Sequence, residues 1–217
     1  MITNSEETQL MQHAFRQVMG AFARPGTVGH IEPFSRLGEV SCLPAPFETA
    51  VRLFVDQAVT FSVAGSAARE QTEWITLQTH AHAAEPDAAA FVLVPDAADA
   101  AARRTALGAA TAGTLIEPEC GATAIVACGA LSAEEQPGLA RIDLEGPGIK
   151  DTASFYVDAA DWAAVRAERA DEYPCGIEIL LVDDEGAVVA VPRTARIACV
   201  APAVGTAPAQ GGASWAM

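Results

Sequence analysis

The sequence is poor in basic residues, and lysine is nearly absent. The 13 basic residues are outnumbered by 28 acidic ones, which gives a formal net charge of −15. A protein that binds nucleic acid or an anionic membrane needs a basic surface, because it must displace counterions from the phosphates. The composition therefore argues against nucleic acid and membrane lipid as partners, whereas basic proteins would be attracted.

Paired cysteines and long apolar segments are also missing. No C-x-x-C pair is present to hold zinc or an iron–sulfur cluster, because the cysteines are scattered as Cys42, Cys120, Cys128, Cys175 and Cys199. No apolar run approaches the roughly 20 residues of a membrane span. The acidic N-terminus, MITNSEETQLMQ, lacks the apolar core of a secretory signal. We therefore expect reduced thiols and a soluble, cytoplasmic protein without metal or cofactor.

The apolar pattern predicts helices that alternate with strands in the first half and hairpins in the second. Helices are predicted from Ser5 to the RPG sequence at 24–26, over 46–56, from a cap at Ser66 to about Gln78, from Pro95 to near Ala110, and over 157–171. Strands are predicted over 27–31, 60–64, 90–94, 122–127, 140–144, 177–182, 187–191 and 195–200. This order indicates an α/β fold, a mixed β-sheet with helices on both faces.

The length favours one α/β domain over residues 1–200. The remaining residues, 201–217, form a low-complexity tail rich in alanine, glycine and proline. We expect this tail to be mobile unless Trp215 docks on the domain.

The chain's one lysine lies in the sequence LEGPGIKD at 144–151. A phosphate-binding loop needs four residues between its glycines and a hydroxyl after the lysine, but here one residue separates Gly146 from Gly148, and Asp151 follows Lys150. A single lysine could instead anchor an aldehyde cofactor as a Schiff base, although nothing else in the sequence marks such a site. A solvated turn at the end of a strand is the simplest interpretation.

Two further clusters contain residue types that carry chemistry. His80 and His82, followed by Glu85 and Asp87, are metal-ligand types, but histidines two apart point the same way only on a strand. The alternative is a solvated connector. Cys120 has acids beside it in IEPECGAT, which oppose formation of a nucleophilic thiolate. Neither cluster is expected to be a functional site.

Arginines are the remaining candidates for ligand binding. Arg193 follows a predicted strand and precedes Thr194, and an arginine beside a hydroxyl can hold an anion. The alternative is a surface arginine that pairs with one of the many acids. Arg16 and Arg24 allow the same two interpretations. We predict ligand binding by Arg16, Arg193, Thr194 and Glu178, and no catalytic residue.

Four stretches together resemble a known family. In order along residues 12 to 197 they are HAFRQVMGAFARPGTV, GTLIEPECGATAIV, LEGPGI and YPCGIEILLVDDEGAVVAVPRTARI. No single stretch is specific, but the set in this order resembles PhnH, the H subunit of the bacterial carbon–phosphorus lyase system. The third stretch includes Ile149 and excludes Lys150. The turn residues of these stretches are Pro25, Gly26, Gly121, Gly146, Gly148, Pro174 and Gly176.

The resemblance implies a homodimeric α/β subunit, similar in fold to pyridoxal-phosphate-dependent transferases but without the cofactor. It also implies a core complex with the G, I and J subunits, in which methylphosphonate displaces adenine from ATP to give ribose 1-methylphosphonate 5-triphosphate. The J subunit later breaks the carbon–phosphorus bond in a radical step, for which this chain lacks clustered cysteines. Two hypotheses follow: a non-catalytic scaffold subunit, or a ligand-binding or enzymatic subunit with a small anion or nucleotide pocket.

Overall fold

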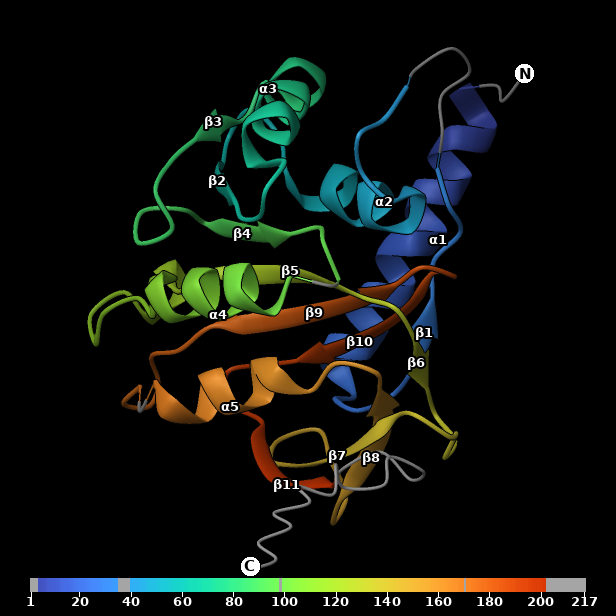
Figure 1. The fold of residues 1–217 in the computed structure, drawn as a ribbon, viewed down its shortest axis with the longest axis vertical. Coiled ribbons are helices and arrows are strands. Elements are labelled where there is room, and N and C mark those ends of the chain that lie inside the picture. Colours follow the sequence, from blue (N-terminus) through green and yellow to red (C-terminus); the bar gives the residue numbers. More distant parts are fainter. Residues whose placement is uncertain (1–3, 35–39, 98, 170, 202–217) are drawn as a thin grey trace, which may run out of the picture.

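The computed structural model describes residues 4–34, 40–97, 99–169 and 171–201 (Figure 1). These residues form a mixed α/β structure with two β-sheets. The predicted tail at 201–217 lies outside the described residues except for Ala201, which ends the last strand.

The larger sheet has seven strands in the order β1-β10-β9-β5-β4-β2-β3. Their bounds are β1 (Gly29–His30), β2 (Thr60–Val63), β3 (His82–Ala83), β4 (Phe91–Val94), β5 (Thr123–Cys128), β9 (Glu178–Asp183) and β10 (Ala187–Val191). The strands from β9 to β3 in this order pair in parallel, whereas β10 pairs antiparallel with both of its neighbours, β9 and β1. Strands β5 and β9 are buried at almost every position, as expected for strands covered on both faces.

Five helices cover this sheet: α1 (Asn4–Ala23), α2 (Ala45–Phe54), α3 (Ala68–Thr79), α4 (Ala100–Ala109) and α5 (Asp161–Glu168). Helices α1, α2 and α3 share a core with Leu93 and Ile125, whereas α4 and α5 share another with Val92 and Val126. Successive strand residues point to opposite faces, so the two helix groups lie on opposite sides of the sheet (Figure 1). The predicted mixed sheet with helices on both faces is confirmed.

The second sheet was not predicted. It has four antiparallel strands in the order β11-β7-β8-β6, namely β6 (Leu131–Ser132), β7 (Ala140–Glu145), β8 (Ala153–Val157) and β11 (Arg196–Ala201). Its apolar side, with Ile142 and Phe155, joins the core that contains α4 and α5. Because Val157 ends β8, the helix predicted over 157–171 is shorter, and α5 begins at Asp161.

Two predicted helix starts are also wrong. Helix α3 begins after Ala67 rather than Ser66, and no side chain caps its first turn. The helix predicted from Pro95 begins instead at Ala100, where the side chain of Asp99 accepts a hydrogen bond from the backbone N–H of Ala102 at 2.8 Å. A residue with a hydrogen-bonding side chain stabilises a helix start more effectively than the proline four residues earlier.

The family-matching turns lie where distant segments meet. Gly121 packs directly against the carbonyl oxygen of Gly176, so any side chain at position 121 would collide with backbone. Gly148 adopts φ +82°, and a Cβ there would lie 2.8 Å from the carbonyl oxygen of Ala23. The other turn residues have these positions: Pro25 and Gly26 follow α1, Gly146 follows β7, and Pro174 precedes Gly176 in the turn before β9.

The LEGPGIKD sequence contains the last two residues of β7 and the turn that follows them, as the strand-end interpretation predicted. Gly146 and Gly148 have positive φ, and Ile149 packs against the core, whereas Lys150 is exposed. The backbone of this loop lies against the turn after α1, so the first and third family-matching stretches are in contact.

Candidate functional site

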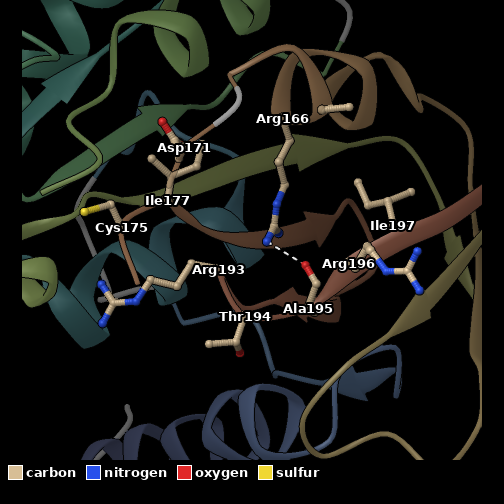
Figure 2. A pocket seen from close by; sticks show the side chains of 11 residues that line it. Arg166, Asp171, Cys175, Ile177, Arg193, Thr194, Ala195, Arg196 and Ile197 are labelled. Carbon is tan, nitrogen blue, oxygen red and sulfur yellow. Dashed lines mark hydrogen bonds between the residues drawn. The ribbon is translucent and has the colours of Figure 1, made fainter. Parts of the chain in front are cut away.

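A pocket of about 330 Å³ opens beside residues 192–195, which connect β10 to β11 (Figure 2). We call it the β10–β11 pocket. Its lining includes two predicted ligand residues, Arg193 and Thr194, and the family-matching Gly176. Its remaining side chains come from the end of α5, the turn before β9 and the start of β11: Arg166, Ala167, Asp171, Cys175, Ile177, Ala195, Arg196 and Ile197.

The position of this pocket differs from the one expected for a strand-end site. Strand β10 runs antiparallel to β9, so its carboxyl end lies at the edge where the parallel strands begin. Ligands of open α/β sheets bind beyond the carboxyl ends of the parallel strands. The strand-end argument that pointed to Arg193 therefore fails, because Arg193 lies at the opposite edge.

Arg193 and Glu178, both predicted to bind a ligand, bind each other. The backbone N–H of Arg193 donates to Oε2 of Glu178 at 3.0 Å, and Nε of Arg193 lies 3.4 Å from Oε1. The Arg193 guanidinium also donates to the carbonyl oxygen of Pro118, in the short 3-10 helix Pro118–Cys120. Through Arg193, these bonds join β9 to the second family-matching stretch. They also neutralise much of the positive charge of Arg193 that an anion would need.

Arg166 is committed to the backbone of the same connection. Its guanidinium donates to the carbonyl oxygens of Val191 at 3.0 Å and Pro192 at 2.6 Å. It also donates to the carbonyl oxygen of Ala195 at 2.9 Å, the bond that Figure 2 shows. Burial lowers the pKa of Arg166 to about 10, against the opposing effect of nearby acids, so the group stays charged at neutral pH. Arg166 therefore holds the β10–β11 connection in place.

The guanidinium groups of this pocket do not converge. Arg196 pairs with Glu145, and Figure 2 shows the side chains of Arg193 and Arg196 pointing to opposite sides. The hydroxyl of the exposed Thr194 has no hydrogen-bond partner among the described residues. The β10–β11 pocket is therefore a structural junction with one available hydroxyl.

Arg16 lies in a different pocket, of about 440 Å³, which we call the α1 pocket. It is lined by His13, Arg16, Gln17, Gly20, Ala21, Arg24, Thr27, Val28 and Gly29. His13 and Arg16 lie on one side of α1, because a three-residue step keeps residues on the same helix face, and Arg24 directly follows the last residue of the helix. The predicted ligand residues thus separate into two places rather than one site.

Arg16 and Arg24 differ from the other described arginines. Within the part of the chain that the structure describes, neither side chain makes an ion pair or a hydrogen bond, whereas every other arginine there does. Both are exposed. Gly20 lies between them, and a Cβ there would contact the Arg24 guanidinium at 3.4 Å. The spacing Arg16–Gly20–Arg24 is the sequence signal that marks this pocket.

The other candidate clusters form no site among the described residues. His80 ends α3 and His82 lies on β3, and no group of three or more metal-ligating side chains comes together in the described chain. Cys120 is exposed at the end of the 3-10 helix. None of the described helices is both long and apolar enough to cross a membrane.

The sequence profile of one family, described as bacterial phosphonate metabolism protein (PhnH), matches residues 4–198. The chain belongs to the PhnH family. This match contains all four stretches named above and both pockets, so each pocket is built from residues within the PhnH region. A search of curated proteins finds no match.

Proposed function

We propose that the chain is the H subunit of a carbon–phosphorus lyase core complex with G, I and J subunits. In this proposal it is a cytoplasmic homodimer that supports formation of ribose 1-methylphosphonate 5-triphosphate without catalysing a step itself. The observation that carries the proposal is the PhnH match over residues 4–198. The commitment of Arg166 and Arg193 to internal bonds supports a non-catalytic role.

The same proposal includes a single domain over residues 1–200 whose fold is similar to that of pyridoxal-phosphate-dependent transferases. Its support is the parallel set of strands between helix layers. A Schiff base needs a lysine held inside a site. Lys150, which is exposed in the turn after β7 and lines neither pocket, has no such position.

An apolar stripe on α1 is the surface we propose for subunit contact. Phe15 and Met19 are 45% and 46% exposed, and the Phe15 ring lies 6.4 Å from that of Phe54 on α2. The stacked rings of Phe54 and Phe91, 6.0 Å apart, continue the stripe onto β4. Large apolar side chains that are contiguous on a surface mark protein interfaces more often than isolated ones.

Co-expression with the G, I and J subunits tests the assembly. The tagged chain should retain I and J through affinity purification and run as a dimer by size exclusion when alone. Met19→Glu should weaken subunit binding or dimerisation, whereas Leu77→Glu, which changes a 74% exposed residue on α3, should leave both unchanged. Failure of the wild-type chain to retain either I or J would contradict the proposal.

A second function is favoured by the unpaired arginines of the α1 pocket. In a chain with net charge −15, two exposed arginines without acidic partners are an uncompensated positive site. Arginine binds phosphate and phosphonate oxygens with two parallel hydrogen bonds. We infer that Arg16 and Arg24 bind a small anion of this kind, with His13 and Thr27 at the same pocket.

Isothermal titration with methylphosphonate and with ATP tests this second function. The wild-type chain should give saturable heat with methylphosphonate, which Arg16→Met with Arg24→Met should abolish, and the same double change should weaken the binding of ATP. Arg69→Met is the matched control, because Arg69 is exposed on α3 and pairs with Glu73. Absence of heat with both anions would leave the scaffold function alone, and loss in the control would refute a local site.

A further inference from the structure

The larger sheet contains a topological switch point that neither pocket occupies. The chain leaves β2 through α3 to reach β3 on one side, and leaves β4 through α4 to reach β5 on the other side. Right-handed crossovers in opposite directions place their helices on opposite faces. Ile75 of α3 and Leu107 of α4 accordingly belong to different cores. The loops after β2 and β4 therefore diverge, which opens a crevice where α/β sheets bind ligands.

A cavity of about 410 Å³ occupies this crevice, and we call it the switch-point cavity. Its lining comes from the segment before α2, the loops after β2, β4 and β9, and the start of α3: Cys42, Pro44, Ala64, Gly65, Ser66, Ala67, Gln71, Pro95, Asp96, Ala97 and Asp184. Gly65 has φ +120°, and a Cβ added there would meet nothing within 4 Å. The small residues after β2 therefore leave their backbone groups accessible to a ligand in the cavity.

Gln71 brings an unpartnered acceptor to this cavity. The residue is only 8% exposed, and its amide nitrogen makes one long hydrogen bond, 3.4 Å, to the carbonyl oxygen of Cys42. Its carboxamide oxygen has no partner among the described residues. The Gln71 oxygen is not fully enclosed, because the buried side-chain atoms without a partner among the described residues do not include it. It is therefore an open acceptor that a hydrogen-bond donor in the cavity can reach.

The charges around the cavity disfavour an anion. Asp96 and Asp184 line it. Burial raises the pKa of the Cys42 thiol, and the charges of Glu70 and Glu48 raise it further. The resulting negative potential repels phosphate, whereas the carboxylate oxygens can accept hydrogen bonds from hydroxyl and amine groups. No trio of metal-ligating side chains gathers here among the described residues, which disfavours a metal ion.

We propose that the switch-point cavity binds a neutral, hydroxyl-rich molecule such as the ribosyl part of a nucleoside. Gln71 and Asp96 accept hydrogen bonds from its hydroxyls, and the small residues after β2 allow it close to the backbone. Dinucleotide-binding sheets use a carboxylate beyond a strand end on ribose hydroxyls in the same way. This site lies apart from the α1 pocket and needs neither Arg16 nor Arg24.

Titration of the full chain with adenosine, followed by amide chemical shifts, tests the proposal. Saturable shifts should centre on Gly65 and Ser66. Gln71→Met keeps the side-chain size and removes its hydrogen bonds, so it should weaken adenosine binding at least tenfold. Gln78→Met is the matched control on α3, outside the cavity, and should bind like the wild type. Ala67→Phe, at an exposed position on the rim, should block binding without changing the core.

Inorganic phosphate and adenosine monophosphate identify the ligand class. Adenosine should bind at least as well as its monophosphate, and phosphate alone should cause no shift at Gly65. Tighter binding of phosphate than of adenosine, unchanged binding in both Gln71→Met and Ala67→Phe, or no adenosine binding would each overturn the proposal. Because this titration involves no other subunit, its failure would leave the assembly proposal untouched.

Discussion

The arginines beside the β10–β11 connection and those of the α1 pocket differ in how many internal bonds they make. Arg166 and Arg193 donate hydrogen bonds to backbone carbonyls, and Arg193 also pairs with Glu178. Arg16 and Arg24 have no such partners in the described chain. A guanidinium has five N–H donors, so the donors left unused decide whether an arginine is available to a ligand. A pocket rich in arginine can thus be structural, whereas a pocket with fewer arginines can keep its donors available.

Replacement of Arg166 should have the largest effect on stability. Arg166→Met removes hydrogen bonds to three carbonyls and should lower the free energy of unfolding by about 3 kcal/mol, since bonds to a charged group contribute about 1.5–3 kcal/mol each and water can replace some of them. Urea denaturation measures this. Arg104→Met, which removes an exposed ion pair with Glu168, should cost at most about 1 kcal/mol. Equal losses in the two variants would contradict a structural role for Arg166.

The pair of Arg193 and Glu178 should give an intermediate effect. Both side chains are 22% exposed, so Arg193→Met should cost about 1–2 kcal/mol. A double-mutant cycle with Glu178→Gln should show positive coupling, because each single change already removes the ion pair between the two side chains, whereas the bond from the backbone N–H of residue 193 does not depend on the arginine side chain. Additive losses would mean that the two residues act separately, and would reopen Arg193 as a free ligand residue.

Arg16 and Arg24 should be nearly silent in the same stability measurement. Each change to methionine should alter the free energy of unfolding by no more than about 0.5 kcal/mol, because neither side chain makes an internal bond in the described chain. A loss as large as that of Arg193→Met would show that these arginines are structural and would remove the contrast between the two regions.

Lys150 should show the smallest effect of all. It is exposed and belongs to neither pocket, so Lys150→Ala should leave complex assembly and growth on phosphonate unchanged. Gly148→Ala is the informative comparison, because its Cβ would meet the backbone of Ala23 and should disturb folding. Loss of growth with folded Lys150→Ala protein would show that the lysine has a function.

Local sequence patterns predicted the strands and helices of the larger sheet better than they predicted which strands pair with one another. The apolar spacing of α1 and the apolar runs of β5 and β9 are enough to predict these elements, because each pattern reflects burial along a single segment. The second sheet could not be predicted in this way. Strand β8 pairs with β6 and β7 through contacts between separate segments, which the periodicity of one segment does not show. The antiparallel direction of β10, which placed Arg193 at the opposite edge, is likewise a long-range property.

The candidate residues show the same limit. Arg193 and Glu178 were both predicted as ligand residues, and only their separation in space could show that they pair with each other. Gln71 drew no attention in the sequence, because a glutamine in an amphipathic helix is ordinary until its burial and missing partner are known.

Growth on methylphosphonate as the sole phosphorus source tests the central claim most directly. Deletion of the gene in the organism that encodes this chain should abolish growth on methylphosphonate but not on inorganic phosphate, and the wild-type chain should restore it. Normal growth of the deletion strain on methylphosphonate would contradict the assignment to a carbon–phosphorus lyase complex.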